Sequence, residues 1–351
     1  MRKFFMNRAD SISLPGISII ILTKNEEGNI RECLDSFVKI DYPPTLFEII
    51  VVDASTDQTP SIVLEYESVR LIKSEAGFSQ QRNEGLKTAR FDIIAFVDAD
   101  TIIPPSWLKG IARGYEEHPD AIGIAGDAFP PKDTNWMDRC IGAVGHPGGG
   151  GIGLDANTVI DSDGITFIPG CNGAFYKSTL EGVGGYNLDF DSGGEDVDMS
   201  RRLCLAGYRL HYEPEMKIYH KPHGPLVNYA KWNIGVGVTK YSLNKPGLIN
   251  MSLEKGSPVW FLFGLALLLL ALLFHPLLAL AGLMGLHLTL QLALRMWSRP
   301  YKLLLQRRRL VGLDKLSIWF VVPVLVYIRQ LFMNIGMWKM WGRQRRVKRE
   351  E

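Results

Sequence analysis

Two pairs of neighbouring carboxylates in this chain have the spacing of catalytic or metal-binding groups. Asp98 and Asp100 follow the apolar run 93–97, and Glu195 and Asp196 come later, at the start of a helical pattern. In an extended chain, residues two apart point to the same side, so both aspartates can face one ligand. Carboxylates this close repel each other unless a cation or hydrogen-bond donors lie between them, and a divalent ion carrying a diphosphate would meet that need. The alternative is that one aspartate caps the next helix while the other faces solvent.

The second pair opens a predicted helix. Met199, Leu203 and Ala206 fall on one face of this helix, and Gly207 is placed to end it. Carboxylates in a first helical turn are favoured by the helix dipole, so Glu195 and Asp196 could also be structural.

The elements that must position these residues form an alternating pattern of strands and helices. Apolar runs predict strands at 17–22, 48–52, 69–72, 93–97 and 121–125, with helical spacing between the first two and a helix start at Thr59, as N-cap, and Pro60. This order implies a parallel sheet with helices on both faces, and ligands of such sheets bind beyond the carboxyl ends of the strands. The polar residues at those ends are Thr23, Lys24, Asn25, Glu26, Asp53, Asp98 and Asp100.

Charge and hydropathy are distributed unevenly along the chain. Residues 295–351 carry 14 Lys and Arg against 3 acidic residues, a net of +11, while the whole chain carries +2. The 39 residues between Lys255 and Arg295 contain no Asp, Glu, Lys or Arg, and a membrane-spanning helix needs only about 20 apolar residues. We therefore expect a membrane protein whose basic tail meets a membrane surface. Nucleic acid is the disfavoured partner, because the basic residues are interleaved with Leu, Trp and Phe.

The four cysteines, Cys33, Cys140, Cys171 and Cys204, show no C-x-x-C spacing. This pattern argues against a zinc site or a disulfide framework and favours reduced thiols in the cytosol. The N-terminus has basic residues but no apolar core before Asn7, so we expect no signal peptide.

Residues 17 to about 240 resemble the family 2 glycosyltransferases of GT-A fold, in the subgroup with C-terminal membrane helices. The matching motifs are IIILTKNE at 19–26, IIVVDASTD at 49–57, QQRN at 80–83, FVDAD at 96–100 and GEDVD at 194–198. The resemblance implies an α/β domain with a mostly parallel, twisted, Rossmann-like sheet, followed by transmembrane or interfacial helices. It also implies inverting transfer of a sugar from a UDP- or GDP-sugar donor with Mg2+ or Mn2+.

The resemblance assigns a role to each matching residue. Nucleotide-sugar contacts are expected from Thr23, Asn25, Glu26, Asp53, Arg82 and Asp98. Asp100, Asp98 and His220 resemble the metal ligands, Asp196 the base that deprotonates the acceptor hydroxyl, and Glu195 a group that orients the acceptor or the loop. Structural alternatives are turn or cap chemistry for Thr23 and Asp53, a surface salt bridge for Arg82, and a satisfied polar group for His220.

The expected organisation follows from these motifs and from hydropathy. It comprises an N-terminal tail (1–14), a GT-A catalytic domain (15–225), an amphipathic interface segment (226–256), a transmembrane hairpin (257–297), a basic cytosolic loop (298–315), a third transmembrane or interfacial helix (316–341) and a basic tail (342–351). Catalytic domain and tail are expected on the cytosolic side of the cell membrane, with 316–341 interfacial or re-entrant. The interface segment should lay Tyr229, Trp232 and Tyr241 toward the lipid headgroups. Its Asn228 and Lys231 replace the Gln and Arg of the Q-x-x-R-W signature, which puts processive synthesis in doubt.

Three functions remain open at this point. The first is a membrane-bound transferase that glycosylates a hydroxyl of a lipid-linked glycan. The second is a polyprenyl-phosphate sugar synthase, whose acceptor is already ionised and needs no strong base, so an intact Glu195 and Asp196 pair favours the first. The third is a non-catalytic membrane partner that binds a nucleotide sugar.

Overall fold

The structure is a computed structural model that describes residues 14–143, 167–190, 193–222, 224, 226–243, 282–283, 285 and 317–350. Its centre is an eight-stranded sheet in the order β3-β2-β1-β4-β7-β6-β8-β5. The strands are β1 (Ile17–Thr23), β2 (Phe47–Asp53), β3 (Val69–Lys73), β4 (Ile93–Asp98), β5 (Thr101–Ile102), β6 (Ala121–Phe129), β7 (Asn172–Tyr176) and β8 (Arg209–His220).

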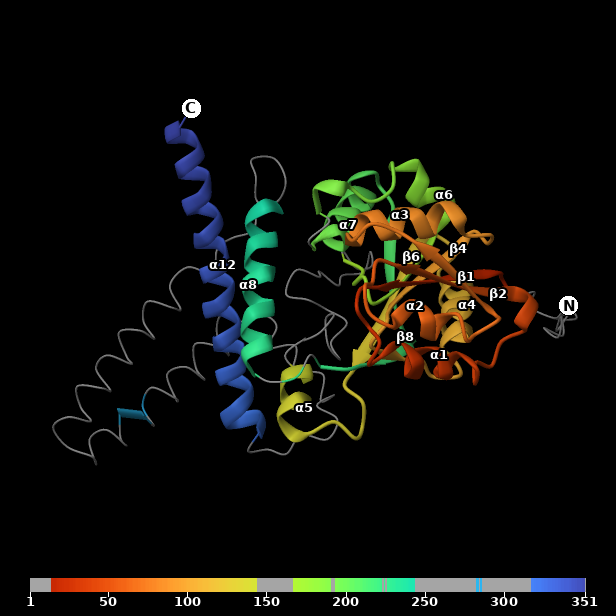
Figure 1. Cartoon of the computed structure of the whole chain (residues 1–351), viewed down its shortest axis with the longest axis horizontal. Coiled ribbons are helices and arrows are strands. Elements are labelled where there is room, and N and C mark those ends of the chain that lie inside the picture. Colours follow the sequence, from red (N-terminus) through yellow and green to blue (C-terminus); the bar gives the residue numbers. More distant parts are fainter. Residues whose placement is uncertain are drawn as a thin grey trace, which may run out of the picture.

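Helices cover both faces of the sheet (Figure 1). The elements are α1 (Ile30–Phe37), η1 (Pro44–Leu46), α2 (Thr59–Val63), α3 (Phe78–Thr88), α4 (Trp107–Glu117), α5 (Trp136–Ala143), α6 (Lys177–Gly182), η3 (Leu188–Phe190), α7 (Glu195–Leu205), α8 (Leu226–Leu243), η4 (Ser317–Val321) and α12 (Val322–Glu350). One hydrophobic core packs α1, α2 and α4 against the face of the sheet to which Ile17, Ile19 and Ile21 of β1 point. The other packs α3, α6 and α7 against the opposite face, to which Ile20 and Leu22 point. Successive residues of β1 thus point alternately into the two cores.

The first half of the sheet confirms the predicted parallel strands. All seven residues of β1 are buried, as expected for a central strand with helices on both faces. β1 pairs in parallel with β2 and β4, and β2 pairs in parallel with β3. The carboxyl ends of these strands therefore meet at one edge, where Thr23, Asp53 and Asp98 end β1, β2 and β4.

The second half of the sheet is mixed. β7 runs antiparallel to both of its neighbours, β4 and β6, while β8 runs parallel to β6 and antiparallel to the short β5. Because β6 and β8 regain the direction of β4, His220 at the end of β8 reaches the same edge as Asp98. The predicted α/β class is confirmed, with a sheet that is mostly rather than wholly parallel.

One local prediction is wrong by a residue. Thr59 is the first residue of α2, and the N-cap is Gln58, whose side chain makes no capping hydrogen bond. Asp57 Oδ1 accepts hydrogen bonds from the Thr59 amide at 3.0 Å and from the Thr59 hydroxyl at 2.6 Å. Pro60, which follows Thr59, has no backbone N–H that needs an acceptor, so Asp57 binds the Thr59 amide instead.

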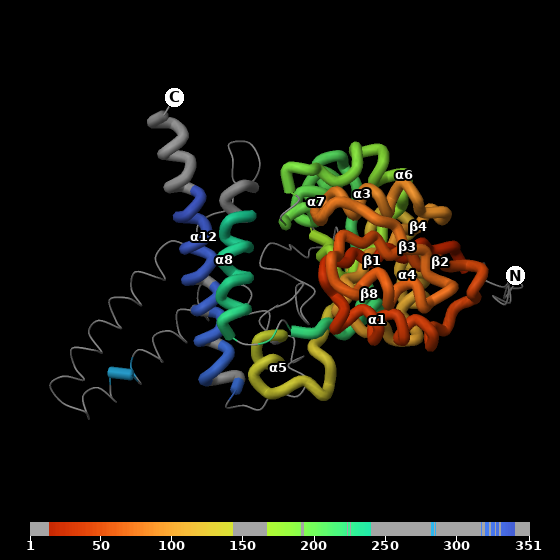
Figure 2. Tube along the Cα trace, in the orientation of Figure 1, coloured from red at the N-terminus to blue at the C-terminus, as the bar shows by residue number. Residues whose placement is uncertain are grey.

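Helices α8 and α12 lie side by side, apart from the sheet (Figure 1). A Cβ atom on Gly237 of α8 would lie 1.9 Å from the Met333 carbonyl oxygen, and one on Gly336 of α12 would lie 2.1 Å from that of Ile234. The two backbones can approach this closely only because both residues are glycines. Figure 2 shows α5 near one end of this pair, where Trp136 Nε1 donates to Ser317 Oγ at 2.6 Å.

The expectation that Tyr229 faces lipid headgroups is wrong. Tyr229 is buried, and its hydroxyl donates a hydrogen bond to the Leu325 carbonyl oxygen of α12 at 3.1 Å. Trp232 is half-buried, and the side chain of Tyr241 is outside the described residues. Residues 226–243 therefore form a helix that packs against α12 through a tyrosine.

Most of the expected membrane segment cannot be compared with the structure. The tail 1–13, the hairpin 257–297 apart from residues 282–283 and 285, and the loop 298–315 fall outside the described residues. Among the helices that are described, none has the length and apolar character that a membrane span requires.

Candidate active site

The carboxyl ends of β1 and β2 bring Thr23 and Asp53 together. The two residues are register partners, both are buried, and Thr23 Oγ1 donates to Asp53 Oδ1 at 2.7 Å. Gln81 of α3 donates from Nε2 to the carbonyl oxygens of Thr23 at 2.9 Å and Val52 at 2.8 Å. These bonds fix the two strand ends relative to each other, so the Asp53 carboxylate is held in one orientation.

Asn25 and Glu26 join the loop after β1 to the loop after β2. Asn25 adopts a left-handed backbone with φ of 61°, its amide donates to Ser55 Oγ at 2.7 Å, and its Oδ1 accepts from the Thr56 amide at 2.8 Å. The Glu26 amide donates to Thr59 Oγ1 at 2.8 Å. Burial raises the pKa of Glu26, Asn29 opposes that shift by donating a hydrogen bond, and the nearby Asp100 and Asp98 add to it. Both residues therefore hold the loop after β1 against the loop after β2 at the edge of the site.

Asp98, Asp100 and His220 meet at the ends of β4 and β8. His220 Nε2 lies 2.8 Å from Asp100 Oδ1 and 3.7 Å from Asp98 Oδ2. The amide of Lys221 donates to the Asp100 carbonyl oxygen at 3.0 Å, which ties the turn after β4 to the end of β8. Burial alone would lower the pKa of His220, but Asp100 and the Cys171 thiol outweigh it and hold the pKa well above its ordinary value. The predicted grouping of two aspartates and a histidine is thus present in the structure.

Cys171 also lies in this group, although no motif or spacing in the sequence indicates it. A carboxylate oxygen of Asp98, the sulfur of Cys171 and a ring nitrogen of His220 all lie within 4.8 Å of one another. The three come from β4, the turn before β7 and β8, so no local cysteine spacing could reveal them. These donors fit a divalent cation, because two are buried while Asp98 remains about one-third exposed on the open side. His223, close to His220 in sequence, lies outside the described residues.

Glu195 and Arg82 form a buried ion pair. Glu195 is the first residue of α7, and its Oε1 lies 3.3 Å from Arg82 Nε of α3. The guanidinium also donates from Nη1 to the Gly170 carbonyl oxygen at 3.3 Å, and it lies 4.7 Å above the ring of Phe96. Burial, reinforced by Asp196, raises the pKa of Glu195 to about 7 even though Arg82 acts to lower it. The alternative of a surface salt bridge for Arg82 is wrong, because both partners are buried; a contact between Arg82 and the donor stays a prediction.

Asp196 is held differently from its neighbour. It is half-buried, its Oδ2 accepts a hydrogen bond from the Gly170 amide at 3.1 Å, and its Oδ1 accepts one from the Val197 amide at 2.8 Å. Gly170 therefore binds Asp196 through its amide and Arg82, the partner of Glu195, through its carbonyl oxygen, and a Cβ atom on it would lie 2.3 Å from Arg82 Nη2. The third acid of the motif, Asp198, accepts from Arg202 Nε at 2.7 Å and is buried. We infer that Asp198 anchors the helix, whereas Asp196 is the acid best placed to meet a reactant.

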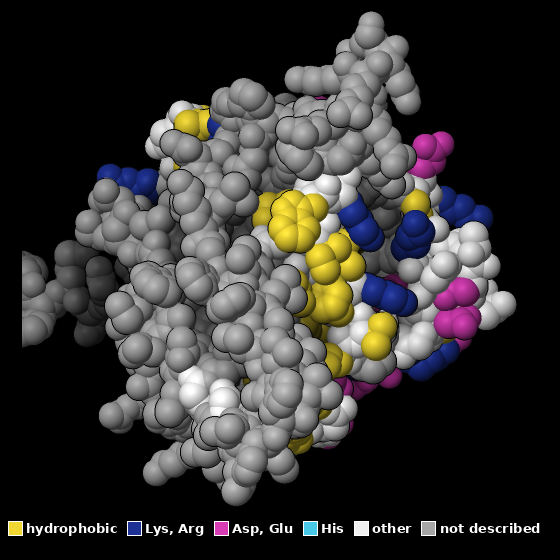
Figure 3. Space-filling view, turned by 90° about the vertical axis from the view of Figure 1, so that its left-hand side faces the viewer, with side chains coloured by type: hydrophobic (Ala, Val, Ile, Leu, Met, Phe, Trp, Pro, Cys, Tyr) yellow, Lys and Arg dark blue, Asp and Glu magenta, His cyan; other side chains and the backbone are white. Residues whose placement is uncertain are grey.

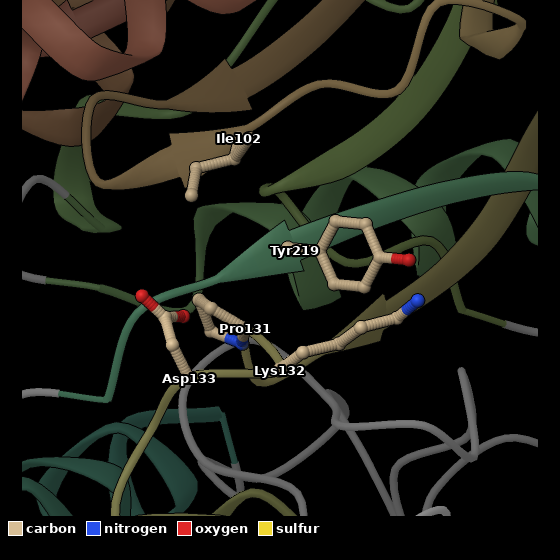
Figure 4. Close-up of a pocket in the computed structure, with 5 residues that line it drawn as sticks. All are labelled: Ile102, Pro131, Lys132, Asp133 and Tyr219. Carbon is tan, nitrogen blue, oxygen red and sulfur yellow. The ribbon is translucent and has the colours of Figure 1, made fainter.

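A small pocket lies beside the carboxyl end of β8 (Figure 4). It has a volume of about 260 Å³ and is lined by Ile102, Pro131, Lys132, Asp133 and Tyr219. Tyr219 precedes His220 and pairs with Ile102, so the two side chains of β8 point to opposite faces of the sheet. The pocket is therefore separated from the carboxylate cluster by the strand itself.

Comparisons with known proteins bear on the family and the fold. Residues 18–184 match the model of glycosyl transferase family 2. A poly-beta-1,6-N-acetyl-D-glucosamine synthase from Staphylococcus epidermidis is 26% identical over 218 residues, which cover 60% of this chain and 51% of the synthase. The chain thus spans about half the length of that relative. A dolichyl N-acetyl-alpha-D-glucosaminyl phosphate 3-beta-D-2,3-diacetamido-2,3-dideoxy-beta-D-glucuronosyltransferase from Methanococcus voltae is 23% identical over 343 residues, covering 92% of this chain and 96% of that enzyme.

Among solved structures, a mannosyltransferase from Pyrobaculum calidifontis in complex with GDP-Man and Mn2+ has a similar fold. The TM-score is 0.58 at 19% sequence identity, and the alignment covers 92% of this chain and 87% of that one.

Proposed function

Because the chain is a glycosyltransferase of family 2, we propose that it transfers a sugar from a nucleotide-diphosphate sugar to a hydroxyl group of a membrane-associated acceptor, with inversion at the anomeric carbon. The observation that carries this proposal is the placement of both acid pairs at one edge of the sheet. The Gly170 amide binds Asp196 at 3.1 Å, and the ligand atom of the next residue, Cys171, lies within 4.8 Å of those of Asp98 and His220, so the two clusters are near enough to act on one substrate.

The donor would bind along the ends of β1, β2 and β4. Asp53, held by Thr23, can accept the imide hydrogen of uracil or guanine. Asp98, Asp100 and His220 would hold a divalent ion, which when bound neutralises the charge of the departing nucleoside diphosphate. The mannosyltransferase with GDP-Man and Mn2+ supports a divalent ion in this fold.

The acceptor would approach α7. Asp196 takes the proton from the acceptor hydroxyl as its oxygen attacks the anomeric carbon, while the nucleoside diphosphate leaves from the opposite face. Glu195 is buried against Arg82, so it positions the start of α7 rather than meeting the acceptor. This division of roles follows from exposure, because a base must reach the proton that it removes.

Several features support an acceptor at the membrane. The 39 uncharged residues between Lys255 and Arg295 and the basic tail favour attachment to the cell membrane with the catalytic domain in the cytosol. Val227, Phe320 and Trp338 of the α8 and α12 region are exposed. On the face in Figure 3, hydrophobic side chains gather beside Lys and Arg side chains, a combination that suits the headgroup region. The Methanococcus voltae relative, matched over nearly its full length, is named for a dolichyl phosphate-linked sugar acceptor.

The decisive experiment separates binding from chemistry. Asp100→Asn should lose metal-dependent binding of the donor, because an amide lacks the charge that holds the ion, whereas Asp196→Asn should keep donor binding and lose turnover. A panel of UDP- and GDP-sugars is titrated calorimetrically with Mg2+ or Mn2+, and turnover is measured with membrane acceptors. Asp189→Asn, an exposed residue of η3, is the matched control. Turnover of Asp196→Asn near the wild-type rate would refute the assignment of the base.

A polyprenyl-phosphate sugar synthase is the second candidate. A phosphate acceptor is already ionised, so that reaction would tolerate the loss of Asp196. The same panel therefore distinguishes the two, if polyprenyl phosphate is included beside lipid-linked glycans. A non-catalytic role would require transfer to be absent with every donor that binds.

A further inference from the structure

The thiol of Cys171 is held by a rigid part of the sheet. The next residue, Asn172, begins β7 and is buried; its Nδ2 donates to the carbonyl oxygens of Asp127 and Met216, both at 2.9 Å. Trp107 Nε1 of α4 donates to Asn172 Oδ1 at 2.9 Å. These three bonds tie the start of β7 to β6, β8 and α4, so the backbones at Cys171 and His220 are fixed relative to each other.

A buried cysteine is usually a small hydrophobic residue. Cys171 differs because a carboxylate and an imidazole lie within reach of the same point: the donor atoms of Asp98, Cys171 and His220 all lie within 4.8 Å of one another. Donors around a tetrahedral ion are about 3.5 Å apart. Asp98 Oδ2 and His220 Nε2, 3.7 Å apart, are already near this spacing, and the Asp98 side chain, about one-third exposed, has room to rotate toward an ion.

We propose that Cys171 is a ligand of the divalent ion, so that the site prefers first-row transition-metal dications such as Co2+ and Zn2+ to Mg2+. This inference rests on the metal site of the proposed function and adds a ligand to it. Oxygen donors alone suit Mg2+, whereas a set with one sulfur and one nitrogen suits softer ions. Coordination replaces the S–H bond of Cys171 with a sulfur–metal bond and the N–H bond of the ligating His220 nitrogen with a nitrogen–metal bond, and both protons are released to solvent.

The test uses the absorption spectrum of Co2+ bound to the full-length protein, with and without UDP or GDP. A thiolate ligand gives a near-ultraviolet charge-transfer band that oxygen and nitrogen ligands do not give. The wild type should show this band, and Cys171→Ser should lose it and bind Co2+ and Zn2+ at least about tenfold more weakly. Mg2+ binding should change much less, because Mg2+ gains little from sulfur.

Cys140→Ser is the control, since Cys140 is equally buried but lies in α5. It should keep both the band and the affinity. A band that persists in Cys171→Ser, Co2+ binding without the band in the wild type, or no binding of Co2+ would each overturn the proposal. If Cys171 only orients His220 and does not bind the ion, the wild type would bind Co2+ without showing the charge-transfer band. Transfer activity with Mg2+ or Mn2+ is assayed separately, so a failure here leaves the proposed transferase function standing or falling on its own measurement.

Discussion

Glu195→Gln tests the electrostatics of the buried pair at the start of α7. In the folded protein the pKa of Glu195 is raised from its ordinary value of 4.5 to about 7, chiefly by burial and then by Asp196. The folded state therefore binds this proton more tightly than the unfolded chain. Stability that Glu195 contributes is fully present below about pH 4.5 and is lost as the pH rises through about 7.

The size of this effect follows from the two pKa values. At about 1.4 kcal/mol for each pH unit between them, ionisation of Glu195 costs the folded state about 3 kcal/mol by pH 8. Glutamine cannot ionise, yet it has nearly the same shape and can still accept a hydrogen bond from Arg82. The free energy of unfolding of Glu195→Gln should therefore rise relative to the wild type by about 3 kcal/mol between pH 4.5 and pH 8.

The assay is urea unfolding of both proteins in the same detergent at several pH values across this range. Glu67→Gln is the control, because Glu67 is an exposed residue between α2 and β3. Its stability should follow the wild type at every pH. Parallel stability curves for the wild type and Glu195→Gln would show that folding does not raise the pKa of Glu195, which would refute the predicted effect of burial.

Two further predictions concern the positioning of the acid pair and the topology of the chain. Gly170→Ala places a Cβ atom 2.3 Å from Arg82 Nη2, so it should lower the free energy of unfolding by about 1–3 kcal/mol and reduce turnover. Gly182→Ala, which has open space around the new Cβ atom, is the control and should change neither quantity. Equal stability and turnover of the two variants would contradict this prediction. A cysteine placed at Gly342 should remain unlabelled by an impermeant thiol reagent in intact cells and react after permeabilisation, because the basic residues that follow favour the cytosolic side; labelling from outside would require a different topology.

The sequence was sufficient to predict the first half of the sheet and the residues at its edge. Buried parallel strands appear as short continuous apolar runs, and each is followed directly by its polar residues, so Thr23, Asp53 and Asp98 could be placed at one edge from local pattern alone. The start of α7 at Glu195 and Asp196 was also predictable, because its apolar residues recur at helical spacing.

Tertiary structure alone decided which distant residues meet. β7 was not predicted, because its antiparallel insertion between β4 and β6 depends on pairing with strands far away in sequence. That insertion brings Gly170 and Cys171 to the site, and the direction of β8 brings His220. The pairing of Arg82 with Glu195 and the burial of Tyr229 against α12 have the same origin. Periodicity determines which face of an element is buried, whereas the partner on that face is determined by the packing of the whole chain.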